Sequence, residues 1–90
     1  MHEAAVSPSP DLTPELQVVR HLVATRLERS IDQVVPAQRL MSDLRLGLLG
    51  LAVLALEVED VTGVLVPFDA LTRAVTVEDL ARALHDHRRR

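Results

Sequence analysis

The side chains that could support metal or acid–base chemistry gather at the C-terminus, where Asp86 stands between His85 and His87. Two imidazoles and a carboxylate can chelate a metal ion weakly. In a terminal segment that continues into three arginines, we expect a solvated tail instead. The remaining histidines and acids are dispersed, whereas an enzyme needs titratable groups that converge on one site. We therefore predict no catalytic residue and no metal ligand.

The basic cluster Arg88-Arg89-Arg90 raises the question of nucleic acid. The net charge is −3, acidic and basic residues are intermixed, and Phe68 is the sole aromatic residue. Three basic charges on an acidic protein give little affinity for a polyanion, and one aromatic ring offers no stacking platform for single strands. We predict no nucleic-acid partner, although the cluster could dock an acidic protein.

Composition also limits the compartment and the kinds of site. The chain has no cysteine, which excludes disulfides and thiolate metal sites. Its longest apolar run, Leu46 to Leu56, is far shorter than the ~20 residues that a membrane-spanning helix needs. The first residues lack the basic region and apolar core of a secretory signal. We expect a cytoplasmic protein with no membrane partner.

A first helix is predicted from Thr13, because a threonine N-cap followed by Pro14 favours a helix start. Apolar residues then recur three or four apart on one face, while charged residues point elsewhere. The expected buried stripe is Leu16, Val19, Val23 and Leu27, and the charged residues expected outside it are Glu15, Arg20 and Glu28.

The connection from about Ser30 to Leu46 is too apolar for a free loop, so we expect it to pack onto the helices. A short helical turn is predicted around Ala37–Met41. The residues expected to pack down are Ile31, Val34, Val35, Leu40 and Leu44.

A second helix is predicted over about Leu48 to Val61, ending before Gly63, which suits a left-handed C-terminal cap. Its first half has almost no polar face, although in a small bundle one side of every helix faces water.

A short helix is expected near Phe68–Leu71, and a last helix begins at Thr76, whose hydroxyl can cap it. The buried stripe expected on this last helix is Val77, Leu80, Ala81 and Leu84.

Residues 12 to 85 resemble an acyl carrier protein. Asp43-Leu44 and Leu49 fit the Asp-Leu-Gly-x-Asp-Ser-Leu run that opens the second helix of carriers, and the spacings to Pro67 and to Thr76-Val77 match without an insertion. The resemblance implies an all-α four-helix bundle of three longer helices and one short one. We assign residues 1–11 to a disordered leader, 12–86 to the carrier-like domain and 87–90 to a basic tail.

The chain departs from carriers at the attachment site. The modified serine falls on Leu48 and the preceding acid on Gly47. In working carriers the serine hydroxyl attacks the pyrophosphate of coenzyme A, and leucine has no hydroxyl. We therefore predict no cofactor. The other hydroxyls considered for the arm lie in other segments: Ser30, Ser42, Thr62, Thr72 and Thr76.

The resemblance then favours a non-carrying protein that acts through protein contacts as a regulator, scaffold or structural subunit. Its pathway would be one of fatty-acid, polyketide or related biosynthesis. Partners would be a second copy or enzymes that recognise carriers, because exposed apolar patches mark contact sites. The alternative is a working carrier with cargo at another hydroxyl, or bound non-covalently with Arg45 near its carboxylate. The contact residues predicted on the second helix are Leu48, Leu51, Ala52, Ala55, Glu59 and Asp60.

Overall fold

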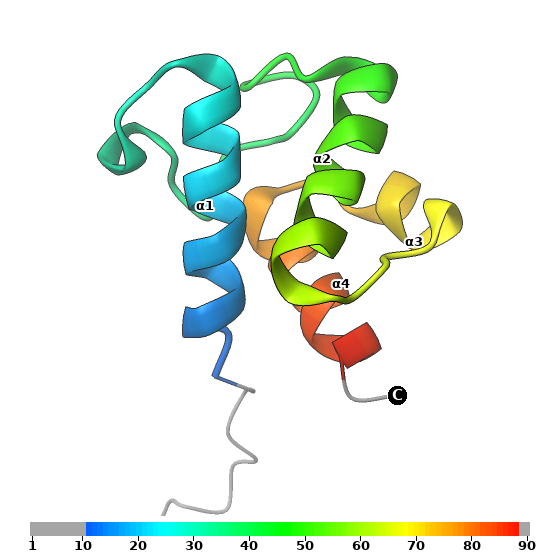
Figure 1. The fold of residues 1–90 in the computed structure, drawn as a ribbon. Helices are drawn as coiled ribbons and strands as arrows, with labels where there is room; N and C mark the ends of the chain where they lie inside the picture. The colour runs from blue at the N-terminus through cyan, green and yellow to red at the C-terminus, as the bar shows by residue number, and fades with distance from the viewer. Residues whose placement is uncertain (1–10, 89–90) are drawn as a thin grey trace, which may run out of the picture.

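The computed structural model describes residues 11–88, which form an all-α bundle (Figure 1). Within that range three longer helices and one short helix occur, with a single 3-10 turn between the first two and no β-strand. The elements are α1 (Thr13–Leu27), η2 (Ile31–Gln33), α2 (Gly47–Thr62), α3 (Phe68–Arg73) and α4 (Val77–Arg88). The predicted fold class is confirmed.

An aliphatic core joins the helices. α1 packs against both α2 and α4, and α3 lies against α2 and α4. Leucine and valine fill the interior, as the near absence of aromatic residues requires. The largest fully buried side chains are Leu40, Leu44, Leu54, Leu71, Leu80, Leu84, Val19, Val23, Val34, Val58 and Val77.

α1 begins at Thr13 as predicted, but Thr13 does not cap it. Leu12 occupies the cap position, and Asp11 Oδ1 accepts a hydrogen bond from the backbone N–H of Thr13 at 3.0 Å. The predicted stripe is buried at Val19 and Val23 and half-buried at Leu16 and Leu27.

The expectation that Glu15 points away from the core is wrong. Its side chain is 3 % exposed, because basic groups from the end of α4 reach over it. The guanidinium of Arg20 is likewise half-buried and binds the connection between α1 and α2.

The connection between α1 and α2 is ordered, as predicted, and buries Val34, Leu40 and Leu44. Its short helix lies at Ile31–Gln33, so the prediction of a helical turn around Ala37–Met41 is wrong. Turns occupy that stretch instead.

Hydrogen bonds tie these turns to the segment before α4, which gives the connection its order. Leu40 N donates to Val75 O at 2.8 Å, and Val77 N donates to Gln38 O at 3.0 Å. Long-range pairing of this kind outweighs the weak local tendency to form a helical turn.

The ends of α2 and α4 follow the sequence signals. α2 ends at Thr62, and Gly63 adopts the left-handed conformation with φ 75°. At the start of α4, Thr76 N donates to Asp79 Oδ2 at 3.0 Å and Asp79 N donates to Thr76 Oγ1 at 3.1 Å, forming the expected cap. All four residues of the predicted α4 stripe are buried.

The helical part of the chain extends slightly beyond the domain end expected at residue 86. α4 continues through His87 and Arg88, two residues assigned from the sequence to the basic tail. The rest of that tail and residues 1–10 of the leader lie outside the described residues, so the predicted disorder of the leader stays a prediction.

Candidate functional site

The segment before α2 is folded back on itself and presents the first turn of that helix at the surface. Asp43 Oδ2 accepts a hydrogen bond from Arg39 N at 2.8 Å, and Asp43 N donates to Arg39 O at 3.1 Å. Leu44 and Leu46 point into the core. Between and after them, Arg45 (φ 55°) and Gly47 (φ 70°) take left-handed conformations that reverse the chain into the helix.

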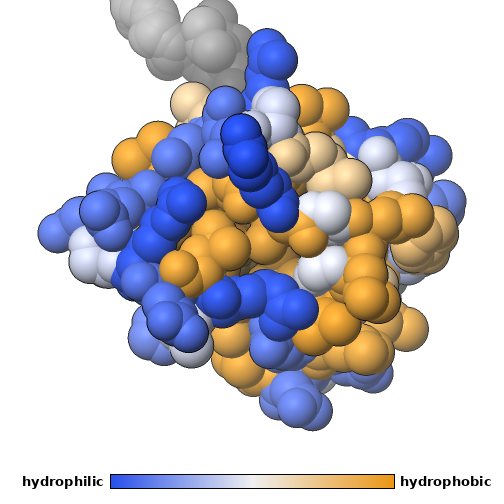
Figure 2. All heavy atoms as spheres, turned by 90° about the horizontal axis from the view of Figure 1, so that it is seen from above, coloured by the Kyte–Doolittle hydropathy of each residue, from blue (hydrophilic) through white to orange (hydrophobic). Residues whose placement is uncertain are grey.

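The first turn of α2 is apolar and exposed. Leu48 is 52 % exposed and Leu49 is 79 % exposed. The turn contains no acidic residue, and no side chain caps its N-terminus. Seen from this end of the molecule, hydrophobic atoms cover much of the centre of the surface and continue to one edge, with polar side chains around them (Figure 2).

Packing divides the apolar helix α2 into two faces. Leu51, Leu54, Ala55 and Val58 are buried in the core. The opposite face carries Leu49 and Leu56, which are 79 % and 59 % exposed, with half-buried Ala52 and Val53 between them.

The predicted contact surface is therefore corrected at two positions, because Leu51 and Ala55 are core residues. Leu48, Glu59 and Asp60 are exposed and Ala52 is half-buried, so these four remain accessible.

The contact residues predicted from the sequence omitted Leu49, Val53 and Leu56, which lie on the exposed face. One signal could have found them: Asp60 marks the water-facing side of α2, and Leu56 and Val53 lie four and seven residues before it. Residues at these spacings share one face of a helix.

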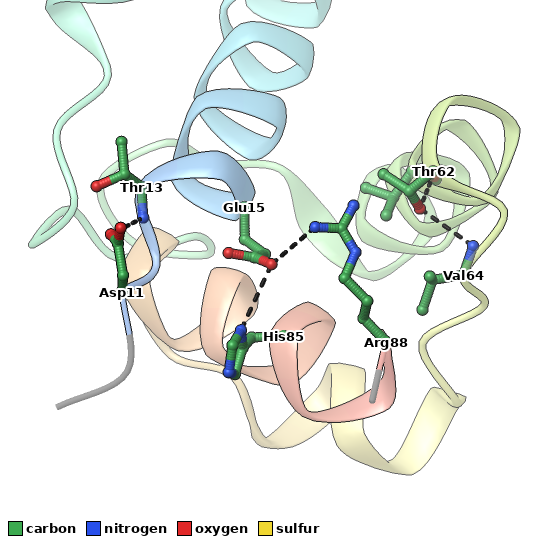
Figure 3. Close-up of polar contacts among 8 residues, drawn as sticks. Asp11, Thr13, Glu15, Thr62, Val64, His85 and Arg88 are labelled. Atoms are coloured by element: carbon green, nitrogen blue, oxygen red, sulfur yellow. Dashed lines mark hydrogen bonds and ion pairs between the residues drawn. The ribbon is translucent and has the colours of Figure 1, made fainter. Parts of the chain in front are cut away.

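The threonine hydroxyls considered as alternative attachment points take part in local hydrogen bonds. Thr62 Oγ1 donates to Val58 O at 2.7 Å and accepts from Val64 N at 3.1 Å (Figure 3). Thr72 Oγ1 donates to Asp69 O at 3.1 Å, and Thr76 caps α4. Ser42 is exposed, but it lies in the turns six residues before Leu48.

A cluster of polar side chains around the carboxylate of Glu15 joins the beginning of α1 to the end of α4. Glu15 Oε2 accepts a hydrogen bond from Arg88 at 2.9 Å and lies 3.4 Å from His85 Nδ1 (Figure 3). His87 turns elsewhere and donates through Nδ1 to Ala83 O at 2.8 Å. The two histidines therefore have different partners. Among residues 11–88 no group of three or more histidine, cysteine or acidic side chains is arranged to hold a metal ion.

Two surface hollows lie among the described residues. A polar hollow of about 670 Å³ lies between α3 and α4 and contains Arg73 and Arg82. An apolar hollow of about 330 Å³ lies between α1 and the end of α2, lined by Leu22, Ile31 and Val61. Arg45 lines neither of them, so it is not placed to orient a carboxylate in either.

No helix between residues 11 and 88 has both the length and the apolar character needed to cross a membrane.

Comparison with known proteins agrees with this fold. Residues 17–84, most of the 90-residue chain, match the family model described as phosphopantetheine attachment site. A search of curated proteins gave no match. The matched range includes α2 and α3 entirely, α1 without its first turn and α4 without its last turn. The chain therefore belongs to the phosphopantetheine attachment site family.

Proposed function

We propose that this chain is a member of the carrier family that holds no covalent phosphopantetheine and acts through protein contacts made by α2. The observation that carries the proposal is the exposed, apolar first turn of α2. The resemblance in spacing assigns Leu48 of this turn to the position where carriers have the attachment serine. A regulator, scaffold or structural subunit of a fatty-acid, polyketide or related pathway would have these properties.

The residues at the start of α2 do not fit the prosthetic group. Attachment needs a hydroxyl that becomes a nucleophile, and α2 contains no serine; its one hydroxyl, Thr62, lies at the far end and is already hydrogen-bonded. Gly47 also replaces the acid that precedes the serine in carriers. We assign no catalytic residue, because the family's role is to be acted on by enzymes.

The exposed face of α2 supports the contact role. Burial of the exposed parts of Leu49 and Leu56 with their half-buried neighbours removes on the order of 300 Å² of apolar surface, which contributes about 7 kcal/mol at roughly 25 cal/mol per Å². Association costs of about 4–15 kcal/mol offset much of this. Burial of this face can therefore contribute much of the free energy of binding to a partner of modest affinity. Glu59 and Asp60 add negative charge at the end of the face.

Intact mass after incubation with coenzyme A and a promiscuous phosphopantetheinyl transferase tests the proposal. The chain is expected to gain no mass. The matched variant Gly47→Asp/Leu48→Ser restores the acid and the hydroxyl at the start of α2 and is expected to gain one phosphopantetheine.

Modification of the unaltered chain would overturn the proposal. Peptide mapping would then name the hydroxyl, with Ser42 as the first one to examine, and the chain would be a working carrier. Because Gly47 has φ 70°, where a side chain is strained, Leu48→Ser alone is measured beside the double variant. Failure of both variants, alongside successful modification of a true carrier, would contradict the assignment of Leu48 to the attachment position.

A further inference from the structure

The exposed face of α2 carries a pattern that is complementary to itself. Leu49 and Leu56 lie near the two ends of the apolar stripe, with the smaller Ala52 and Val53 between them. A basic residue, Arg45, lies just before the helix, and an acidic residue, Asp60, lies near its end. The side chains of Arg45 and Asp60 are both exposed. Neither forms an ion pair with another residue in the range 11–88.

Two copies of this face match when the helices run antiparallel. If Ala52 of one copy lies opposite Val53 of the other, Leu49 lies opposite Leu56. The segment just before α2, which carries Arg45, then lies near the end of the partner helix, which carries Asp60. Every pair then occurs twice, as a two-fold axis requires. The small central residues let the helix axes approach. Each acidic C-terminal turn lies beside the N-terminus of the partner helix, where the helix dipole favours negative charge.

From this match we propose that the α2 face binds a second copy of the same chain, forming an antiparallel two-fold dimer centred between Ala52 and Val53. The inference rests on the proposed function, since it names the partner of the same face. In the view of Figure 1 no described segment crosses in front of α2, and the exposure of Leu49 and Leu56 shows that this face is open. An enzyme that binds carriers through a basic patch would face an apolar stripe and the like charge of Arg45 here. A second copy instead offers an apolar stripe and an acidic helix end, which are complementary to this face.

The expected dimer is weak and reversible. A contact made by one helix from each copy is smaller than the roughly 1,600 Å² of a standard protein interface. Sedimentation equilibrium over a range of protein concentrations is the direct measurement, and a monomer–dimer equilibrium is expected.

Leu56→Glu is expected to weaken association at least tenfold, because it places a carboxylate opposite Leu49 twice in each dimer. Val75→Glu changes an equally exposed apolar residue on the loop before α4 and is the matched control.

Exchange of the two charges tests the arrangement itself. Arg45→Glu and Asp60→Arg are each expected to weaken association, because like charges then face each other at both ends of the contact. The double variant Arg45→Glu/Asp60→Arg restores opposite charges and is expected to recover the affinity of the unaltered chain. A double variant weaker than either single variant would overturn the pairing.

Cross-linking tests the direction of the helices, because the chain has no cysteine of its own. An oxidised mixture of Leu49→Cys and Leu56→Cys chains is expected to give mixed disulfide dimers. Either variant alone is expected to give few, since identical positions lie about 10 Å apart along antiparallel axes. Efficient linkage of Leu49→Cys to itself would overturn the antiparallel arrangement.

The two proposals fail separately. A chain that stays monomeric at the highest concentrations and gains no phosphopantetheine overturns the dimer and leaves the proposed function intact. A chain that dimerises through α2 and also becomes modified overturns the absence of the covalent arm and leaves the dimer intact.

Discussion

The carboxylate of Glu15, at the beginning of α1, accepts a 2.9 Å hydrogen bond from the guanidinium of Arg88, at the end of α4 (Figure 3). The glutamate side chain is 3 % exposed and that of the arginine is 41 % exposed, so the pair joins the core to the surface. It connects residues 73 positions apart. The contact fastens the last turn of α4 against the first turn of α1.

Replacement of Glu15 by glutamine is expected to destabilise the protein. The amide keeps the shape of the carboxylate but removes the charge that binds Arg88 and lies near His85. Hydrogen bonds to charged groups contribute about 1.5–3 kcal/mol, and the exposure of Arg88 favours the lower part of that range. Urea denaturation measures the change. Glu59→Gln alters an exposed acid and serves as control; an equal effect of both variants would contradict a specific role for Glu15.

Asp11 is expected to make stability depend on acid. Hydrogen bonds from the side chain and then from the backbone of Thr13 hold the pKa of Asp11 below its ordinary value of 3.8. A carboxyl with a lower pKa in the folded state stabilises the protein above its unfolded pKa and loses that contribution as the pH falls through its folded pKa. Asp11→Asn should therefore be less stable than the unaltered chain near neutral pH, and the difference should disappear in acid, below the folded pKa of Asp11.

Thermal denaturation of Asp11→Asn and the unaltered chain across this pH range checks the expectation. Asp32→Asn, in the exposed 3-10 turn, is the control. A difference that persists unchanged in strong acid would show that the Asp11 carboxylate does not act through its charge.

Arg20 is expected to hold the connection between α1 and α2 in place. Its Nε donates to Val34 O at 2.6 Å, and a terminal nitrogen donates to Ile31 O at 3.0 Å. Arg20→Ala leaves both carbonyls without this partner and should cost about 1–3 kcal/mol. Arg20→Lys keeps the charge but loses the forked geometry that reaches two acceptors, and it should recover only part of the loss. Full recovery in urea denaturation would contradict the role of the fork.

The two left-handed helix ends are expected to respond in opposite directions. Gly63 ends α2 with φ 75°, and Glu28 ends α1 with φ 56°. Gly63→Ala places a side chain where L-residues are strained and should destabilise by about 1 kcal/mol, although the space around it is open. Glu28→Gly relieves the same strain and should stabilise by a similar amount. Differential scanning calorimetry of both variants measures the shifts, and shifts of the same sign would contradict the argument.

The sequence by itself determined the features that depend on neighbours along the chain. The end of α2 at Gly63 and the cap of α4 by Thr76 and Asp79 follow from local hydrogen bonds and backbone preference. The buried stripe of α4 follows from helical periodicity, because polar residues and the small Ala83 occupy the rest of that helix. The spacings that resemble those of carriers, from Leu48 to Pro67 and on to Thr76, likewise predicted the helical bundle.

Only the tertiary structure decided which side of α2 faces water. An almost uniformly apolar helix contains little information about its own rotation, so contact with the surrounding core selected Leu51 and Ala55 for burial and left Leu49 and Leu56 exposed. The burial of Glu15 has the same origin, since its basic partners lie 70 and 73 residues away. Such choices depend on which surfaces meet after the chain folds back on itself, and residues far apart in the chain supply those surfaces.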